Sequence, residues 1–270
     1  MGWLTGIPAL VALPLFAIVP AAVAIAAHAW FRHRVPPERL DDHDVAGYLV
    51  AVVGVLYSVV LGFLVGTVWT GFSAAQQTAD TEAGAVADAF NYAARLPRRE
   101  RRIIQRLVAR YAVVVRDDEW SYARRGVEDP EANRILGEAV TYTTAISPEA
   151  TRKDSGKLLM EASIQSQLLA SLRDVGDARR LRIVQAQSRL PNGMLEALVL
   201  GGLMVICFVF FFGMRSFSRQ MAITGLVAGS IGLFLGLALE LSTPYSGAMH
   251  ISTDAWTFVI DNNHLRDFAK

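Results

Sequence analysis

The sequence predicts an all-α membrane protein with four transmembrane helices and a helical soluble insert between spans two and three. Hydrophobic residues make up 53% of the 270 positions and charged residues only 19%, which is more apolar than soluble domains usually are. The excess lies in four segments, each close to the twenty apolar residues that a spanning helix needs. These segments are residues 7–30, 46–72, 194–213 and 221–239. Between residues 73 and 192 the apolar positions recur at helical spacing, so the insert is predicted to be helical.

Residues 46–96 are predicted to form one continuous helix that leaves the membrane. Its first 27 positions carry no charged residue, and at about 1.5 Å per residue they cross a hydrocarbon core of roughly 30 Å. Its second part is too polar for lipid, yet small apolar residues continue down one face: Phe72, Ala75, Ala79, Ala83, Val86, Phe90 and Ala93. The first residue that stops a helix is Pro97. The soluble insert is therefore expected to pack against a direct extension of span two.

The rest of the chain divides at clear helix signals. Gly225, Gly229, Gly232 and Gly236 give span four a smooth face for close packing. In the insert, Asp129–Pro130 and Ser147–Pro148 each pair an N-cap residue with proline at the first helical position. Gly176 is expected to break a helix, and residues 243–247 to form a tight turn before an extended polar stretch. The predicted parts are a first transmembrane hairpin (1–72), a helical soluble domain (73–192), a second hairpin (193–240) and a tail (241–270).

No catalytic or metal-binding signature occurs in the sequence. It has no HExxH, Walker, GxGxxG or GxSxG pattern, and its five histidines are scattered. The single cysteine, Cys207, excludes a disulfide or a cysteine metal site within one chain. We therefore expect neither an enzyme nor a bound cofactor.

Polar residues inside span two are candidates for lining a pore. Tyr57, Ser58, Thr67 and Thr70 lie in this otherwise apolar segment, with Phe63 near its middle. Gly62 and Gly66 form a GxxxG pattern, which permits close helix contact in lipid. Two interpretations stay open at this point, a water-filled pathway and a helix-packing surface.

Acidic residues follow just beyond the span. Asp80, Glu82 and Asp88 are the charged residues between Phe72 and Arg95. If several copies surround an axis, these carboxylates form rings that raise the local cation concentration at a pore mouth. The alternative is a solvated helix face. An arginine-rich run follows (Arg95, Arg98, Arg99, Arg101, Arg102, Arg106 and Arg110), and it is expected to pair with the acidic helix. No nucleic-acid partner is expected, because no aromatic residues are interleaved with these arginines.

The order of short motifs resembles the bacterial bestrophin-like family of unknown function. The motifs are residues 54–63, residues 78–87 with Glu82, Leu190–Pro191 before span three, and residues 244–247 (Pro-Tyr-Ser-Gly) after span four. The resemblance implies an oligomeric anion channel built around span two. The sequence departs from it in having acidic residues at the mouth and, in place of the phenylalanine run of a bestrophin neck, Phe63 alone. The resemblance thus implies anions, whereas the acidic mouth suggests cations.

We therefore expect an oligomeric ion channel of the bacterial inner membrane, whose partners are the lipid bilayer, small inorganic ions and its own copies. The alternative is a membrane-anchored helical sensor or scaffold without transport activity. Arginines in the two short loops (Arg32, Arg34, Arg39, Arg215 and Arg219) predict that these loops are cytoplasmic and that residues 73–192 lie outside. A bestrophin arrangement would instead place the insert in the cytoplasm.

Overall fold

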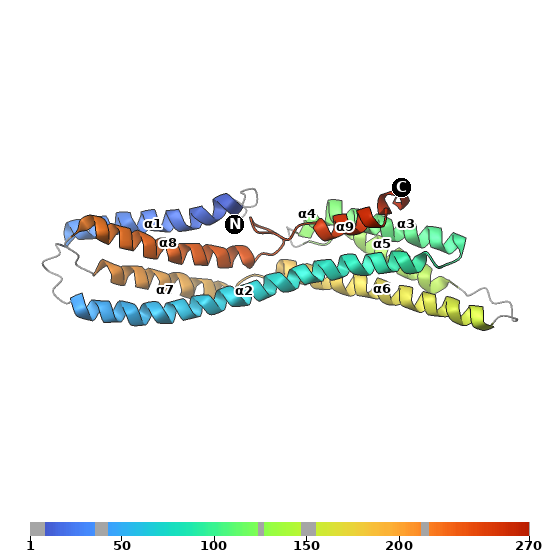
Figure 1. The fold of residues 1–270 in the computed structure, drawn as a ribbon, viewed down its shortest axis with the longest axis horizontal. Helices are drawn as coiled ribbons and strands as arrows, with labels where there is room; N and C mark the ends of the chain where they lie inside the picture. Colours follow the sequence, from blue (N-terminus) through green and yellow to red (C-terminus); the bar gives the residue numbers. More distant parts are fainter. Residues whose placement is uncertain (1–8, 36–42, 124–126, 147–154, 212–215, 270) are drawn as a thin grey trace. The chain divides into compact units, whose positions relative to one another are not determined.

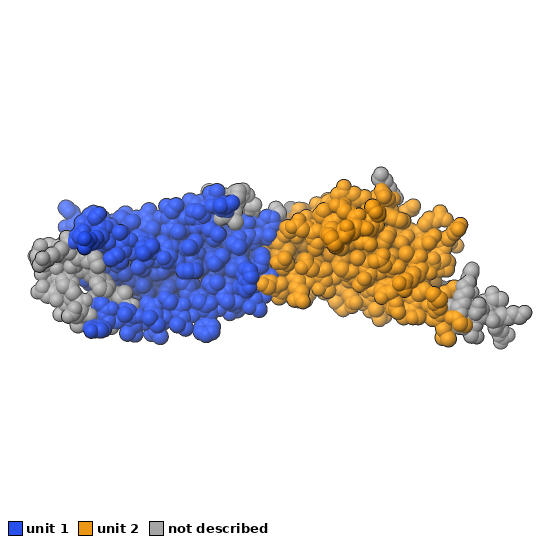
Figure 2. Space-filling model, viewed as in Figure 1, with its two compact units in different colours: residues 1–72, 189–243, 247–250 blue, residues 73–188, 244–246, 251–270 orange. Residues whose placement is uncertain are grey.

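The described part of the chain is helical and forms two compact units. A computed structural model of the full chain describes residues 9–35, 43–123, 127–146, 155–211 and 216–269. Unit 1 comprises Met1–Phe72, Arg189–Thr243 and Gly247–His250, and unit 2 comprises Ser73–Ser188, Pro244–Ser246 and Ile251–Lys270 (Figure 1, Figure 2). The predicted all-α fold is confirmed.

Unit 1 contains the four predicted spans. They are α1 (Ala9–Arg34), the first part of α2 (His43–Ala93), α7 (Asn192–Phe210) and α8 (Phe217–Leu241). Four described helices are long and apolar enough to cross a membrane, and they correspond to these elements. Because α1 and α8 are in extensive contact along their lengths, two antiparallel spans far apart in the sequence form one packed pair.

Glycines make the contact between α1 and α8 possible. A Cβ atom added to Gly232 would overlap the carbonyl oxygen of Phe16, and one added to Gly236 would overlap the ring of the same residue. The smooth face predicted for span four therefore packs directly against the backbone of α1.

Unit 2 is built around the second part of α2. Its other helices are α3 (Arg98–Val114), η2 (Val115–Glu119), α4 (Trp120–Ala123), α5 (Pro130–Ala145), α6 (Ser155–Gln187), α9 (Asp254–Asn262) and α10 (Leu265–Phe268). The segment η2 is a π-helical turn, which holds more residues than an α-helical turn. The continuous helix predicted to Leu96 ends three residues earlier, at Ala93. The predicted small-residue face is buried from Ala75 to Ala93.

Some of the helix starts and breaks predicted from the sequence of unit 2 are confirmed and one is wrong. Asp129 caps α5 as predicted, since its carboxylate accepts a hydrogen bond of 2.9 Å from the backbone of Glu131. The predicted break at Gly176 is wrong, because α6 runs through it without interruption. The predicted non-helical stretch from Ala248 ends where α9 begins, at Asp254. Ser147–Pro148 lies outside the described residues.

The turn after α8 is held by a buried carboxylate. Glu240 accepts backbone hydrogen bonds from Ala248 at 2.7 Å and from Met249 at 3.3 Å. Gly247 has a φ of 110°, which side chains rarely allow. The predicted tight turn therefore folds back onto the last turn of α8.

Candidate functional site

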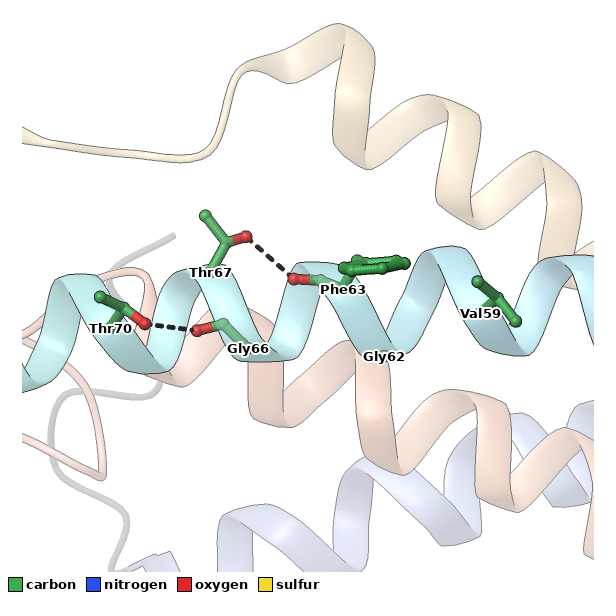
Figure 3. Close-up of a pocket in the computed structure, with 6 residues that line it drawn as sticks. All are labelled: Val59, Gly62, Phe63, Gly66, Thr67 and Thr70. Atoms are coloured by element: carbon green, nitrogen blue, oxygen red, sulfur yellow. Dashed lines mark hydrogen bonds between the residues drawn. The ribbon is translucent and has the colours of Figure 1, made fainter.

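One face of α2 in unit 1 is left uncovered. Six residues of this single helix line an open groove of about 470 Å³: Val59, Gly62, Phe63, Gly66, Thr67 and Thr70 (Figure 3). Phe63 is 75% exposed. On the opposite face Leu61, Leu64 and Val68 are buried against residues of α7 and α8. Within the unit, α2 therefore has one packed face and one open face.

The hydroxyl groups in this groove are satisfied by their own helix. Thr67 donates to the carbonyl of Phe63 and Thr70 to that of Gly66, each at 2.9 Å (Figure 3). Because the donors are used locally, the hydroxyls can lie in an apolar setting at small cost. Their oxygen lone pairs remain able to accept a hydrogen bond or contact a cation.

The predicted pore-lining residues do not share one face. Phe63, Thr67 and Thr70 lie together in the groove. Ser58 is exposed and donates to the carbonyl of Gly54 at 2.7 Å, but it lies about 140° around the helix from Phe63 at 100° per residue. It therefore lies outside the groove.

Tyr57 is a correction to the sequence prediction. Its ring packs on α7, where a Cβ atom added to Gly201 or Gly202 would come within about 3.0 Å of it. Its hydroxyl is buried and has no hydrogen-bond partner among the described residues. Because two glycines of α7 leave room for the ring, Tyr57 belongs to the packed face of α2.

Unit 2 has an acidic groove of its own. Ala74, Gln77, Thr81, Gly84 and Asp88 follow Thr70 at steps of three and four, and they line a groove of about 700 Å³ together with α6. From α6 come Asp174, Asp177 and Gln185. Asp177 also pairs with Arg180. Three carboxylates therefore line one groove, and one of them is paired with an arginine.

Glu82 is not at a solvent-facing mouth, which corrects a second prediction. It is completely buried, and Arg182 of α6 donates to it from Nε at 2.5 Å and from Nη2 at 3.1 Å. Tyr111 donates a further hydrogen bond of 2.7 Å. The reason is its register, since it falls between Ala79 and Val86 on the buried face. A side chain buried within one protomer cannot line a pathway between protomers.

The other two acidic candidates are on the surface of unit 2. Asp88 lines the acidic groove. Asp80 is exposed on α2 but is not among the residues that line this groove, so its place at a mouth stays a prediction.

The ion pair of Glu82 belongs to a larger buried network. Arg182 also donates to Glu119 at 3.2 Å, and Arg179 donates to Glu119 at 3.0 Å. The guanidinium of Arg182 lies 5.3 Å from the ring centroid of Trp120. Two carboxylates and two guanidinium groups balance in charge, and they connect α2, η2 and α6.

Burial shifts the pKa values of Glu119 and Tyr111 in this network. It raises the pKa of Glu119, although Arg182 and Arg179 oppose the shift. It also raises the pKa of Tyr111, with a contribution from the charge of Glu82. These shifts reflect a dry interior, so we assign the network to holding α2 in unit 2.

The arginine-rich run does not supply the partner of the acidic helix. Arg110 pairs with Glu131 of α5 at 2.7 Å, and the guanidinium of Arg95 lies 5.7 Å from the ring centroid of Tyr92. The partner of Glu82 comes instead from α6, so the pairing predicted from the sequence is wrong for this residue.

Sequence reasoning overlooked the contribution of α6. Asp174 and Asp177 are three residues apart, as are Arg179 and Arg182, and this spacing places each pair on one side of a helix. The expected break at Gly176 concealed the first pair, because it falls between Asp174 and Asp177.

These features define a class of protein. Four apolar helices carry a helical unit between the second and the third, and the second helix continues into that unit with one open face. The chain belongs to the Bestrophin-like domain family, whose model matches residues 18–256. The resemblance inferred from the short motifs is confirmed.

Solved structures share this fold. A bacterial bestrophin homologue from Klebsiella pneumoniae is 18% identical, with a TM-score of 0.61, and the match covers 95% of this chain and 97% of that one. A mutant of the same description has a TM-score of 0.63 at 15% identity with the same coverage. A crystal structure described as a membrane protein gives a TM-score of 0.65 at 16% identity, again covering 95% and 97%. The comparison with curated proteins gave no match.

Proposed function

We propose that the protein is an oligomeric ion channel of the bacterial inner membrane, whose copies surround an axis and turn the open face of α2 toward it. The observation that carries this proposal is the groove of Val59, Gly62, Phe63, Gly66, Thr67 and Thr70, which no other described residue lines. One protomer supplies only one wall of a pathway, so several copies are needed to close it.

The residues of the groove suit a narrow pathway through lipid. Gly62 and Gly66 leave space along the helix, and Thr67 and Thr70 present hydroxyl oxygens. Phe63 is the largest side chain among them and is exposed. A ring of such residues is an apolar constriction, which can gate a channel by excluding water.

We propose that the conducted ions are cations. Asp88, Asp174 and Asp177 line the groove of unit 2 to which α2 contributes one wall. Repeated around an axis, these carboxylates raise the local concentration of cations and oppose anions. The resemblance to bestrophins implies an anion channel. We depart from that implication because the residues that line this groove include three carboxylates.

Ion flux from liposomes tests conduction and the constriction. The purified protein is expected to release Na⁺ or K⁺, and Phe63→Ala is expected to raise the rate several-fold by widening the apolar ring. Absence of flux for every small ion tested would overturn the channel. An unchanged rate for Phe63→Ala would show that Phe63 does not form the constriction.

Selectivity needs a separate comparison. The double variant Asp88→Asn with Asp174→Asn is expected to lower the ratio of cation to anion permeability. Asp118→Asn is the matched control, because Asp118 is an exposed carboxylate of unit 2 outside the groove. The variant Asp80→Asn tests the remaining candidate. An equal effect of the control would show that net charge, and not the groove, sets selectivity.

Subunit number separates this proposal from its alternative. Native mass spectrometry in detergent is expected to give a closed oligomer of more than two copies. A monomer or dimer without flux would favour a membrane-anchored helical sensor or scaffold.

The arginine distribution supports the proposal that residues 73–192 lie outside the cytoplasm, in contrast to a bestrophin arrangement. Replacing Cys207, the sole cysteine, by serine gives a background in which Asp118→Cys can be probed. Labelling of intact cells by a membrane-impermeant maleimide is expected. Labelling only after lysis would place this unit in the cytoplasm.

A further inference from the structure

A polar cluster lies buried among the spanning helices of unit 1. His28 of α1 is completely buried. Its Nδ1 lies 2.6 Å from the hydroxyl of Thr224, and its Nε2 lies 2.9 Å from the side-chain nitrogen of Gln220. The imidazole also stacks on Phe210 of α7, with ring centroids 4.3 Å apart. His28 therefore connects α1 to α8 and also contacts α7.

Arg32 sets the direction of the hydrogen bond on one side of the ring. The guanidinium of Arg32 donates to the side-chain oxygen of Gln220. Because arginine only donates, this contact fixes the amide with its oxygen toward Arg32 and its NH₂ group toward His28. The Nε2 atom of His28 must then accept a hydrogen bond, so it carries no proton.

Thr224 sets the direction on the other side. Its hydroxyl donates to the backbone carbonyl of Gln220 at 3.0 Å, so its oxygen is left to accept from His28. The Nδ1 atom of His28 is therefore the donor. Both constraints select one state of the ring, the neutral tautomer with its proton on Nδ1.

A second proton on His28 has no acceptor in this cluster. An Nε2–H group would face the NH₂ group of Gln220, and turning the amide would bring that NH₂ group against Arg32. Among the described residues, Arg32 of α1 is the charged group that acts on His28. The groups facing the ring from α8 and α7 are Gln220, Thr224 and Phe210, none of which is acidic. The new charge would thus be buried, unpaired and beside a like charge.

We propose that His28 is a proton-sensitive joint between α1 and α8: it holds the two helices together as the neutral Nδ1–H tautomer, and acid weakens the contact by breaking its hydrogen bond to Gln220. This role goes beyond ion conduction and does not depend on it. The ligand of the site is the proton.

NMR of protein labelled with ¹⁵N-histidine tests the protonation state directly. At about pH 5, below the ordinary histidine pKa of about 6.5, His28 is expected to keep the signals of the neutral Nδ1–H tautomer. The variant His28→Asn assigns these signals by their loss. His33→Gln is the matched control, because His33 is an exposed histidine of the same helix. Protonation of His28 together with the exposed histidines, or a proton on Nε2, would overturn the proposal.

A designed reversal distinguishes the joint from simple packing. In Gln220→Glu a carboxylate can accept from both Arg32 and a protonated His28, so NMR is expected to show His28 protonated at neutral pH. The thermal unfolding midpoint of the wild type is expected to fall as the pH drops below about 6.5, the ordinary pKa of histidine, and this fall is expected to shrink in Gln220→Glu. An identical pH response in the two proteins would refute the role of the Gln220 hydrogen bond.

Discussion

Arg182 and Glu82 form an ion pair of 2.5 Å in which neither side chain is exposed to solvent. The pair joins α6 to the buried face of α2. Tyr111 donates a further hydrogen bond to Glu82, and Arg182 donates a further one to Glu119. Glu82, which the sequence suggested for a pore mouth, is therefore a buried residue that holds α2 to α6 within unit 2.

Removing one partner of this pair is expected to be strongly destabilising. Arg182→Ala leaves Glu82 charged and buried, which costs about 3–5 kcal/mol in the free energy of unfolding. The matched control is Arg180→Ala, two residues away, where the pair with Asp177 is largely exposed and the expected change is below about 1 kcal/mol. Thermal and chemical unfolding of both variants measure the difference. Similar losses in the two would contradict the assignment of the network.

The hydroxyl of Tyr57 is expected to be dispensable. It is buried without a hydrogen-bond partner among the described residues, so Tyr57→Phe removes an unpaired polar group. The free energy of unfolding is expected to stay unchanged or to rise by up to about 1 kcal/mol. Ion flux is expected to be unchanged, because the side chain lies on the packed face. A marked fall in ion flux would show that Tyr57 lines the pathway after all.

The contact of α1 with α8 is expected to tolerate no side chain at Gly232. In Gly232→Ala the added methyl group meets the backbone of Phe16 and the ring of Pro20, and such overpacking costs about 1–3 kcal/mol. Gly54→Ala is the control, because nothing lies within 4 Å of a Cβ atom there. Thermal unfolding midpoints in detergent compare the two. A stable Gly232→Ala would mean that the helices are less closely packed.

Unit 2 is expected to lose stability in alkali. Burial raises the pKa values of Tyr111 and Tyr245 above the ordinary value of 10.0. Above about pH 10 the unfolded chain therefore releases these protons while the folded chain retains them, so the free energy of unfolding falls as the pH rises. Below that pH the contribution is fully present.

The variants Tyr111→Phe and Tyr245→Phe test this cause. Each is expected to flatten the fall of the unfolding midpoint between pH 9 and pH 11, even though it lowers the midpoint at neutral pH by removing a hydrogen bond. Tyr48→Phe is the control, since Tyr48 is exposed. The same slope in all three variants would show that other groups cause the alkaline loss.

Much of the fold could be predicted from the sequence because its signals are local. Length and hydropathy identified the four spans, and the absence of a breaker before Pro97 identified the continuous α2. The Asp129–Pro130 start of α5 depends only on neighbouring residues. The break expected at Gly176 is absent from α6, because a glycine weakens a helix without ending it when the flanking turns pack well.

It was harder to predict from the sequence which side chains lie on the buried face of a helix, because this depends on partners that are distant in the sequence. The sequence made Tyr57 a candidate pore residue. In the structure its ring lies against Gly201 and Gly202 of α7, which leave space for it. Glu82 carried a usable signal, since it occupies the register of the buried alanines. Its partner Arg182 is 100 residues away, and no local pattern connects the two.

The π-helical turn at Val115–Glu119 has a consequence for the length of the chain. Glu119 at its end meets Arg179 and Arg182, and the indole of Trp120, the next residue, donates to the carbonyl of Ile251 at 3.2 Å. Winding the same five residues as a regular α-helix, without removing one, would rotate both side chains by about 100° relative to α3. The extra residue accommodated by this turn therefore sets the direction in which Glu119 and Trp120 point, so inserting one more residue here would turn both away from their partners.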